Sequence, residues 1–185
     1  MKKSNHKTNI VIAKLAQILS GYYDVQKDIF LNGRKNELLA QSKQKLQHYA
    51  ISKKLIVDES HLNDYLVIQS ETSTPTQELL SNHFSWLEEW AKTKTSSEER
   101  HMRSRFALVL LLEEKWLPLN FEQMVKKYSK SYWLKFGING WYETMMICYH
   151  LPTSSIYSNR RSKDFLSLLE KISEFEKTEL TKQEI

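Results

Sequence analysis

The chain has 185 residues, of which 41% are hydrophobic, while only four are Gly and three are Pro. This hydrophobic content excludes a globally disordered chain, and the scarcity of turn residues argues against a β-sandwich or a doubly wound sheet. The formal net charge of +5 favours an anionic partner.

The first helix is predicted to begin near Thr8, which can cap it, and to end at Gly21. Residues 1–19 place a basic stretch before an apolar one, as a signal peptide does. However, Lys14 and Gln17 interrupt the apolar residues, and no small-x-small cleavage site precedes Gly21. We therefore interpret this segment as a basic arm and a first helix.

Further helices are predicted before the middle of the chain. One spans residues 25–31 and ends at the Asn32-Gly33 pair, and a longer one spans about residues 35–50. Another follows Asp58, although residues 65–69 could instead form a strand. These segments are interpreted as one small, basic helical unit.

The polar stretch over residues 70–75 is the best linker candidate, because it has no apolar residue and ends in Pro. Helices are then predicted from Pro75, around the apolar stretch 106–116, over residues 139–151 and from Ser162 onward. The predicted fold class is all-α. Its domains are a basic N-terminal helical domain over residues 1–69, a linker over 70–75 and a C-terminal helical bundle over 76–185.

Residues 121–133, FEQMVKKYSKSYW, come closest to a functional motif. Asn120 and Gln123 form a capping box for one short helix, and Ser131 can cap a second, as in a helix-turn-helix. The lysines would then contact DNA phosphates. The alternative is a pair of core helices with a solvated lysine face, since the turn lacks Gly and the second helix is highly aromatic.

Basic residues gather in two stretches. Between Gly33 and Lys54 there are six basic residues and a single acidic one, Glu37, and the second stretch lies in and after the candidate motif. Either could be a solvated outer face rather than a binding surface. The residues predicted to bind nucleic acid are Arg34, Lys35, Lys43, Lys45, Lys53, Lys54, Lys126, Lys127, Lys130 and Lys135.

The last predicted helix carries one apolar stripe, made of Phe165, Leu168, Leu169, Ile172 and Phe175. Such a stripe either closes the domain or forms a dimer or partner helix. A dimer would suit duplex DNA, because two-fold symmetry matches palindromic sites.

Catalysis is not expected from these residues. Cys148 and His150 would point apart on a helix, and the histidines show no metal-binding spacing. The single cysteine also excludes a disulfide framework within one chain and favours a reducing, cytoplasmic location. No catalytic residue, metal, cofactor or small-molecule substrate is predicted, and no membrane-spanning run of about 18 apolar residues is present.

These features predict a non-enzymatic protein that binds double-stranded DNA, as a regulator or as an accessory protein in replication or transfer. Single-stranded RNA is a weaker option, based on aromatic residues among basic ones after Lys126. The alternative from a different class is a protein-binding adaptor or inhibitor whose basic face docks on an acidic partner.

Overall fold

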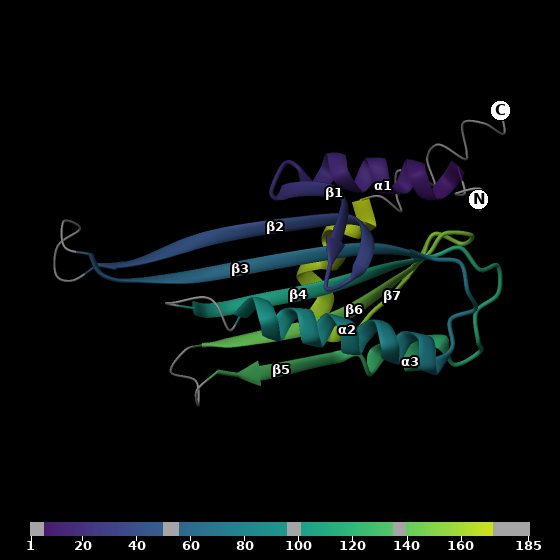
Figure 1. Ribbon diagram of the computed structural model, residues 1–185. Helices are drawn as coiled ribbons and strands as arrows, with labels where there is room; N and C mark the ends of the chain where they lie inside the picture. The colour runs from purple at the N-terminus through teal and green to yellow at the C-terminus, as the bar shows by residue number, and fades with distance from the viewer. Residues whose placement is uncertain (1–5, 50–55, 96–100, 135–139, 172–185) are drawn as a thin grey trace.

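The computed structural model describes residues 6–49, 56–95, 101–134 and 140–171 (Figure 1). Its strands there are β1 (Asp24–Leu31), β2 (Arg34–Tyr49), β3 (Ile56–Glu71), β4 (His101–Leu112), β5 (Ser129–Trp133), β6 (Trp141–His150) and β7 (Ser155–Tyr157). The helices are α1 (His6–Leu19), α2 (Gln77–Thr95), α3 (Phe121–Lys126) and the 3-10 turn η2 (Arg160–Ser162), after which residues 163–171 are helical.

Seven strands form one mixed sheet within the described residues, in the order β1-β2-β3-β4-β6-β5. The pairs β3–β4 and β4–β6 are parallel, and the other pairs are antiparallel. Since β4 occupies one side of β6 along its whole length, β5 and β7 share the other side. The predicted all-α fold is therefore wrong, because the chain is built on a sheet.

The β1–β2 hairpin shows how one sequence signal was misread. Asn32 and Gly33 have positive φ values of 44° and 74°, and Leu31 pairs directly with Arg34. An Asn-Gly pair with left-handed backbone at both positions is the preferred two-residue turn between antiparallel strands. The pair does not end a helix, as predicted, but joins the two strands that replace the helices predicted over residues 25–31 and 35–50.

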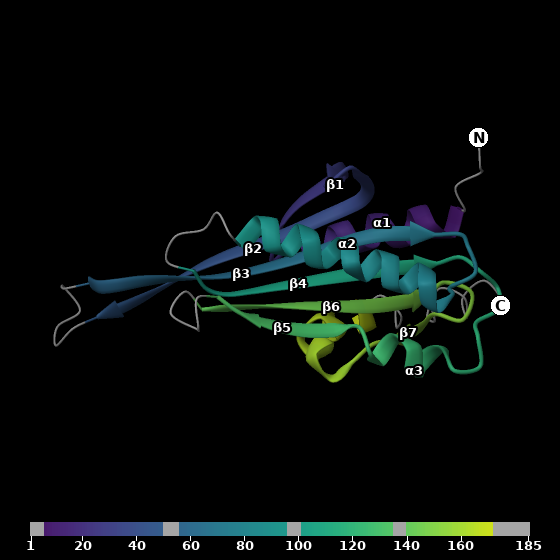
Figure 2. The ribbon, with the colours of Figure 1, turned by 60° about the horizontal axis from the view of Figure 1, so that its bottom comes forward.

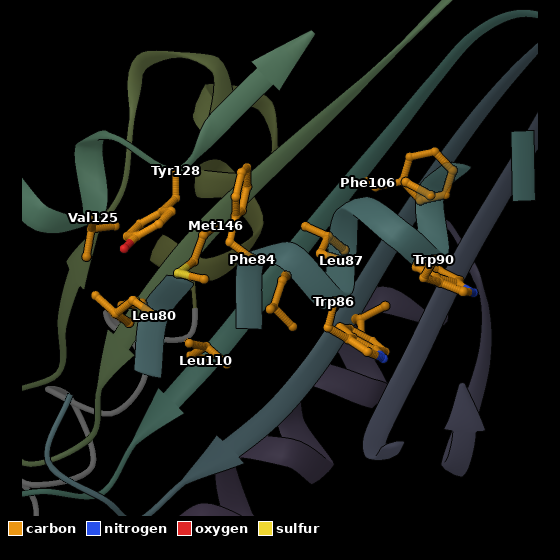
Figure 3. Close-up of a cluster of buried hydrophobic side chains, with 14 of the residues drawn as sticks. Leu80, Phe84, Trp86, Leu87, Trp90, Phe106, Leu110, Val125, Tyr128 and Met146 are labelled. Atoms are coloured by element: carbon orange, nitrogen blue, oxygen red, sulfur yellow. The ribbon is translucent and has the colours of Figure 1, made fainter. Parts of the chain in front are cut away.

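Two apolar layers, one on each face, hold the sheet together. On one face, α2 packs Leu80, Phe84 and Leu87 against the inward residues of β4 and β6 (Figure 3). On the other face, α1 and Phe165 of the helical residues 163–171 cover the alternate residues (Figures 1 and 2). Central strands covered on both sides are apolar at every position, unlike half-exposed strands.

That double coverage explains why residues 106–112 looked like a central helix. All seven side chains are fully buried in β4, with the even-numbered ones facing α2 and the odd-numbered ones facing α1. Residues 139–151 were misread for the same reason, since they contain β6. The segment after Asp58 is likewise β3, and the strand considered for residues 65–69 lies inside it.

The helix predictions near Thr8 and Pro75 are confirmed by α1 and α2. The second begins at Gln77, where Thr76 caps it by accepting a hydrogen bond from the Leu79 amide at 3.1 Å. Among the described helices, none is long and apolar enough to cross a membrane.

Strands from both sides of the predicted linker belong to the same sheet. The chain leaves β3 at Glu71, forms α2 over one face and returns as β4, which pairs in parallel with β3. The division into domains around residues 70–75 stays a prediction, although neither part is a purely helical unit.

The helix-turn-helix prediction is wrong. Its first helix exists as the six-residue α3, but residues 129–133 form strand β5 instead of a second helix. The physical reason is alternation: Tyr132 stacks on Tyr142 of β6, with ring centroids 4.8 Å apart, while its neighbours Ser131 and Trp133 point to the other face.

Candidate partner-binding site

The residues predicted to bind nucleic acid form two groups on different parts of the sheet. Arg34, Lys35 and Lys43 lie on β2, whereas Lys126 and Lys127 end α3 and Lys130 lies on β5. Strands β3, β4 and β6 separate β2 from β5. The structure therefore does not bring the two groups together. The side chain of Lys45, and the residues Lys53, Lys54 and Lys135, lie outside what the structure describes.

Acidic neighbours engage several of these cations. The Lys35 ammonium lies 3.0 Å from an Asp28 carboxylate oxygen, and the Lys130 ammonium lies 2.9 Å from one of Glu88. Arg34 is half-buried, with its guanidinium carbon 5.5 Å from the centre of the Trp86 ring. On β2, Lys35 therefore has an acidic partner and Arg34 packs on an aromatic ring.

Strand β5 offers a different feature, namely an open backbone edge. Tyr128 accepts a hydrogen bond from the Met146 amide, and the Leu134 amide donates to Gly140, both at 3.0 Å. Because antiparallel pairs alternate, residues 128, 130, 132 and 134 direct their backbone groups toward β6. Ser131 and Trp133 consequently direct their N–H and C=O groups outward, where they have no hydrogen-bond partner among the described residues.

The opposite edge of the sheet is less open. Asp28 is left out of the β1–β2 pairing, although the register is the same on both sides of it, and its φ of 50° is left-handed. An irregular backbone with a charged side chain in an edge strand discourages the addition of another strand. The outer edge at β5, seen at the bottom of Figure 1, has no such interruption over residues 129–133.

Side chains on the two faces of β5 differ in character. On the α2 face, the Tyr132 hydroxyl and the Lys130 ammonium both donate to the half-buried carboxylate of Glu88. Burial first, and then that hydrogen bond, raise the pKa of Tyr132. On the other face, the Trp133 side chain is 70% exposed and its ring contacts that of Trp141. Because Trp is enriched at protein interfaces, this exposed side chain on an open edge strand makes β5 a candidate contact surface.

A pocket of about 560 Å³ lies beside the start of β5 and is basic in character. Three cations from two elements line it, namely Lys126 from the end of α3 and Arg160 and Arg161 from η2, together with Ser129 and Asn159. We call this set of five residues the basic pocket. Among the residues that the structure describes, no acidic side chain lines it.

Asn159 holds the pocket together. Its side-chain amide donates to the Tyr128 carbonyl at 3.2 Å, and its side-chain oxygen accepts from the Arg161 amide at 3.0 Å. The Arg161 guanidinium in turn donates to the Ser131 hydroxyl, which donates to Glu143 at 3.2 Å. The turn that carries both arginines is therefore tied to the start and to the middle of β5.

Sequence reasoning found one side of this pocket and missed the other. Lys126 was predicted as a contact residue, but Arg160 and Arg161 were not, because they are thirty residues away in the chain. The adjacent arginines after Asn159 were the available signal, since two neighbouring cations at a capped turn are unusual. The topology, which brings β7 beside β6, is what places them next to β5.

The predicted partner helix lies partly in the core. Phe165 and Leu169 are 1% and 2% exposed and pack under α1, while Leu168 is half-buried. Ile172 and Phe175 lie outside the described residues. The packing of Phe165 and Leu169 supports the option that this helix closes the domain, which sequence analysis had left open.

Cys148 is fully buried in the α2-side core, and burial raises the pKa of its thiol. On a strand, Cys148 and His150 point to the same face, unlike on the predicted helix. Both imidazole nitrogens of His150 are engaged, at 2.7 Å from the Thr153 hydroxyl and 2.7 Å from the Glu114 carbonyl. This arrangement supports a structural role for each of them.

Comparison with known proteins gives a family but no functional relative. No curated protein matches the chain. Residues 7–171, which include all the strands and the basic pocket, match the model of the family described as "Domain of unknown function (DUF8052)". The chain belongs to this family.

Proposed function

We propose that this protein is a non-enzymatic adaptor that binds an extended, acidic segment of a partner protein along β5. The observation that carries the proposal is the outward-facing backbone of Ser131 and Trp133. A partner strand would continue the sheet by hydrogen bonding to these groups, which is a common mode of peptide recognition.

The chemistry of this edge favours a polypeptide over DNA. Each outward residue presents one donor and one acceptor, and a polypeptide backbone supplies the matching acceptor and donor in alternation. DNA phosphates only accept hydrogen bonds, so they would leave the Ser131 and Trp133 carbonyls unpaired. Pairing with a strand satisfies both kinds of group.

The surroundings of the edge favour an acidic segment. Arg160 and Arg161 form no ion pair with any acidic side chain in the described part of the chain. They lie at the start of β5, while Trp133 provides an exposed apolar contact at its end. Complementary charge and aromatic anchors are common features of specific interfaces.

The decisive variant is Ser131→Pro. Proline removes the outward N–H of residue 131 without removing a hydrogen bond to β6, because that amide does not face β6. Peptides of about ten residues, long enough for one strand, would be selected from a random display library on the wild-type protein. Acidic, proline-poor sequences are expected to be enriched, and synthetic versions should bind Ser131→Pro at least about tenfold more weakly.

Ser131→Ala is the matched control, because it loses the same hydroxyl but keeps the backbone N–H. It should bind the selected peptides within about threefold of wild type, a difference below 1 kcal/mol. No enrichment of acidic sequences, or equal binding by the proline and alanine variants, would contradict strand addition at β5.

DNA binding without a helix-turn-helix is tested separately. About five phosphate contacts predict a slope of log K against log salt concentration near −4 to −5. Titration with random-sequence duplexes at two salt concentrations measures this slope. Steep, specific duplex binding combined with no peptide binding would favour the DNA prediction over the adaptor.

A further inference from the structure

The basic pocket carries more positive charge than a single carboxylate would neutralise. Three cations line it, and only Lys126 has an acidic partner among the described residues, with its ammonium 2.6 Å from a Glu122 oxygen. Both members of that pair are more than half exposed, so the pair contributes at most about 1 kcal/mol and can be replaced by a ligand. With Glu122 included, two positive charges remain unbalanced.

One hydrogen-bonding group of the pocket is also unused. The Ser129 hydroxyl oxygen is buried and has no hydrogen-bond partner within the described residues. A buried hydroxyl without a partner costs free energy unless a ligand or water satisfies it. Ser129 belongs to both β5 and the lining of the basic pocket, so this unused group lies where the two features meet.

We propose that the basic pocket binds a phosphate monoester carried by the polypeptide segment that pairs with β5. This inference rests on the proposed function and names the chemistry of the partner. A phosphorylated side chain carries about −1.5 to −2 charges at neutral pH, which matches the two unbalanced positive charges. Guanidinium groups bind phosphate oxygens through paired hydrogen bonds, and here two arginines are available.

Arg160 and Arg161 play different parts in this arrangement. Arg161 is held by the Ser131 hydroxyl, so its position depends on β5. Arg160 is exposed, lines the pocket and makes no ion pair with a described acidic residue, which leaves its guanidinium available for the ligand. A segment paired with β5 would bring its phosphate to these arginines only at the end of the strand near Ser129.

The first experiment tests the pocket alone, with inorganic phosphate as the probe. Titration of the full chain should shift the backbone amide signals of Ser129 and of residues 159–162, and sodium acetate at equal ionic strength should not. Arg160→Gln should weaken phosphate binding about tenfold, the expected loss of one charge-assisted contact.

Lys127→Gln is the matched control, because Lys127 is an exposed lysine next to Lys126 that does not line the pocket. It removes the same charge and should leave phosphate binding within about twofold of wild type. Absence of the phosphate-induced shifts, equal shifts with acetate, or equal losses in the two variants would overturn the phosphate site.

The second experiment tests the source of the phosphate. A peptide selected for binding β5 is prepared with and without a phosphoserine at either end. One phosphorylated form should bind at least about tenfold more tightly than the plain peptide, and Arg160→Gln should remove that gain while weakening the plain acidic peptide by no more than about threefold.

The two proposals fail in distinguishable ways. If the plain peptide binds but phosphorylation brings no gain, strand addition stands and the phosphate inference is overturned. If inorganic phosphate binds in an Arg160-dependent manner while no peptide binds, a polypeptide source is overturned together with the adaptor function.

Discussion

His83 of α2 and Glu71 of β3 form a half-buried pair, with 3.1 Å between the imidazole Nε2 and a carboxylate oxygen. Burial lowers the pKa of His83 from 6.5 by more than the hydrogen bond to Glu71 raises it. For Glu71, burial acts to raise the pKa, but hydrogen bonds from Ser73 and His83 together bring it below 4.5. The pair ties the first half of α2 to the sheet.

We predict that acid destabilises this protein in two steps at this pair. Since folded His83 binds a proton less readily than unfolded His83, stability present above pH 6.5 is lost as the pH falls through the lowered folded pKa. Stability due to Glu71 is present above pH 4.5 and is lost as the pH falls through its own lowered folded pKa. Urea denaturation at a series of pH values measures both steps.

His83→Gln should flatten the upper step, and His6→Gln, at the exposed start of α1, should leave the pH profile unchanged. A His83→Gln profile parallel to that of wild type would show that the upper step arises elsewhere.

Arg105 of β4 donates two parallel hydrogen bonds to the Asp64 carboxylate of β3, at 2.7 Å from Nε and 2.6 Å from Nη2. Both side chains are less than 15% exposed, and the pairing holds Arg105 over the Phe165 ring at 5.0 Å. Asp64→Asn should lower the free energy of unfolding by about 1–3 kcal/mol, because a charge-assisted pair is lost in a partly buried place.

Asp28→Asn provides the comparison, because it removes the carboxylate of an exposed pair with Lys35. Exposed pairs contribute about 0–1 kcal/mol. Chemical denaturation of the two variants measures the difference, and equal losses would mean that burial does not strengthen the Arg105 pair.

Gly140 and Gly33 share a φ of 74° but differ in their surroundings. A Cβ added at Gly140 would lie 2.0 Å from the Met102 carbonyl oxygen, whereas one at Gly33 would meet nothing within 4 Å. Gly33→Ala should therefore cost only the strain of a left-handed alanine, about 1–2 kcal/mol. Gly140→Ala should cost clearly more, because the backbone of β4 has to move.

Thermal unfolding of the two alanine variants measures this difference. Because Gly140 also accepts the Leu134 amide that ends the β5–β6 pairing, its replacement should weaken peptide binding at β5 as well. Equal melting temperatures for the two variants would contradict the predicted clash.

Thr144 of β6 is fully buried and its hydroxyl has no hydrogen-bond partner in the described structure. Thr144→Val keeps the shape and removes the unpaired hydroxyl, so it should stabilise the protein by about 1 kcal/mol. Thr144→Ser keeps the hydroxyl and deletes a methyl group, so it should destabilise by about 1 kcal/mol. Opposite shifts of the two denaturation midpoints are expected, and a loss of stability in Thr144→Val would reveal a hidden partner of the hydroxyl.

The sequence identified elements whose signals are local. The helix α2 has apolar residues on one side and a polar opposite side, which a helical period captures, whereas α1 was indicated by its end signals, Thr8 and Gly21. The strands failed for a tertiary reason. Leu38, Leu39 and Ala40 are buried in succession because both faces of β2 are covered there, and such a run has no period that separates strand from helix.

The candidate site was only partly visible in the sequence for the same reason. Lys126 and Lys130 stood out as local charge, but the open backbone of Ser131 is a property of strand order, which no local pattern contains. Arg160 joins Lys126 only because β5 and β7 pair with successive stretches of the same edge of β6. A correct hairpin reading at Asn32-Gly33 would have been the most direct route to a sheet.

The apolar run of β4 has a consequence for synthesis of the chain. Residues 106–112 are all apolar and carry no charge, a composition that promotes intermolecular aggregation until neighbours cover it. Its partner β6 emerges from the ribosome about thirty residues later. Until then, the edge of β4 that pairs with β6 has no neighbouring strand. The run is flanked by Arg103 and Arg105 before it and by Glu113 and Glu114 after it, and charges in such positions oppose self-association of an apolar strand.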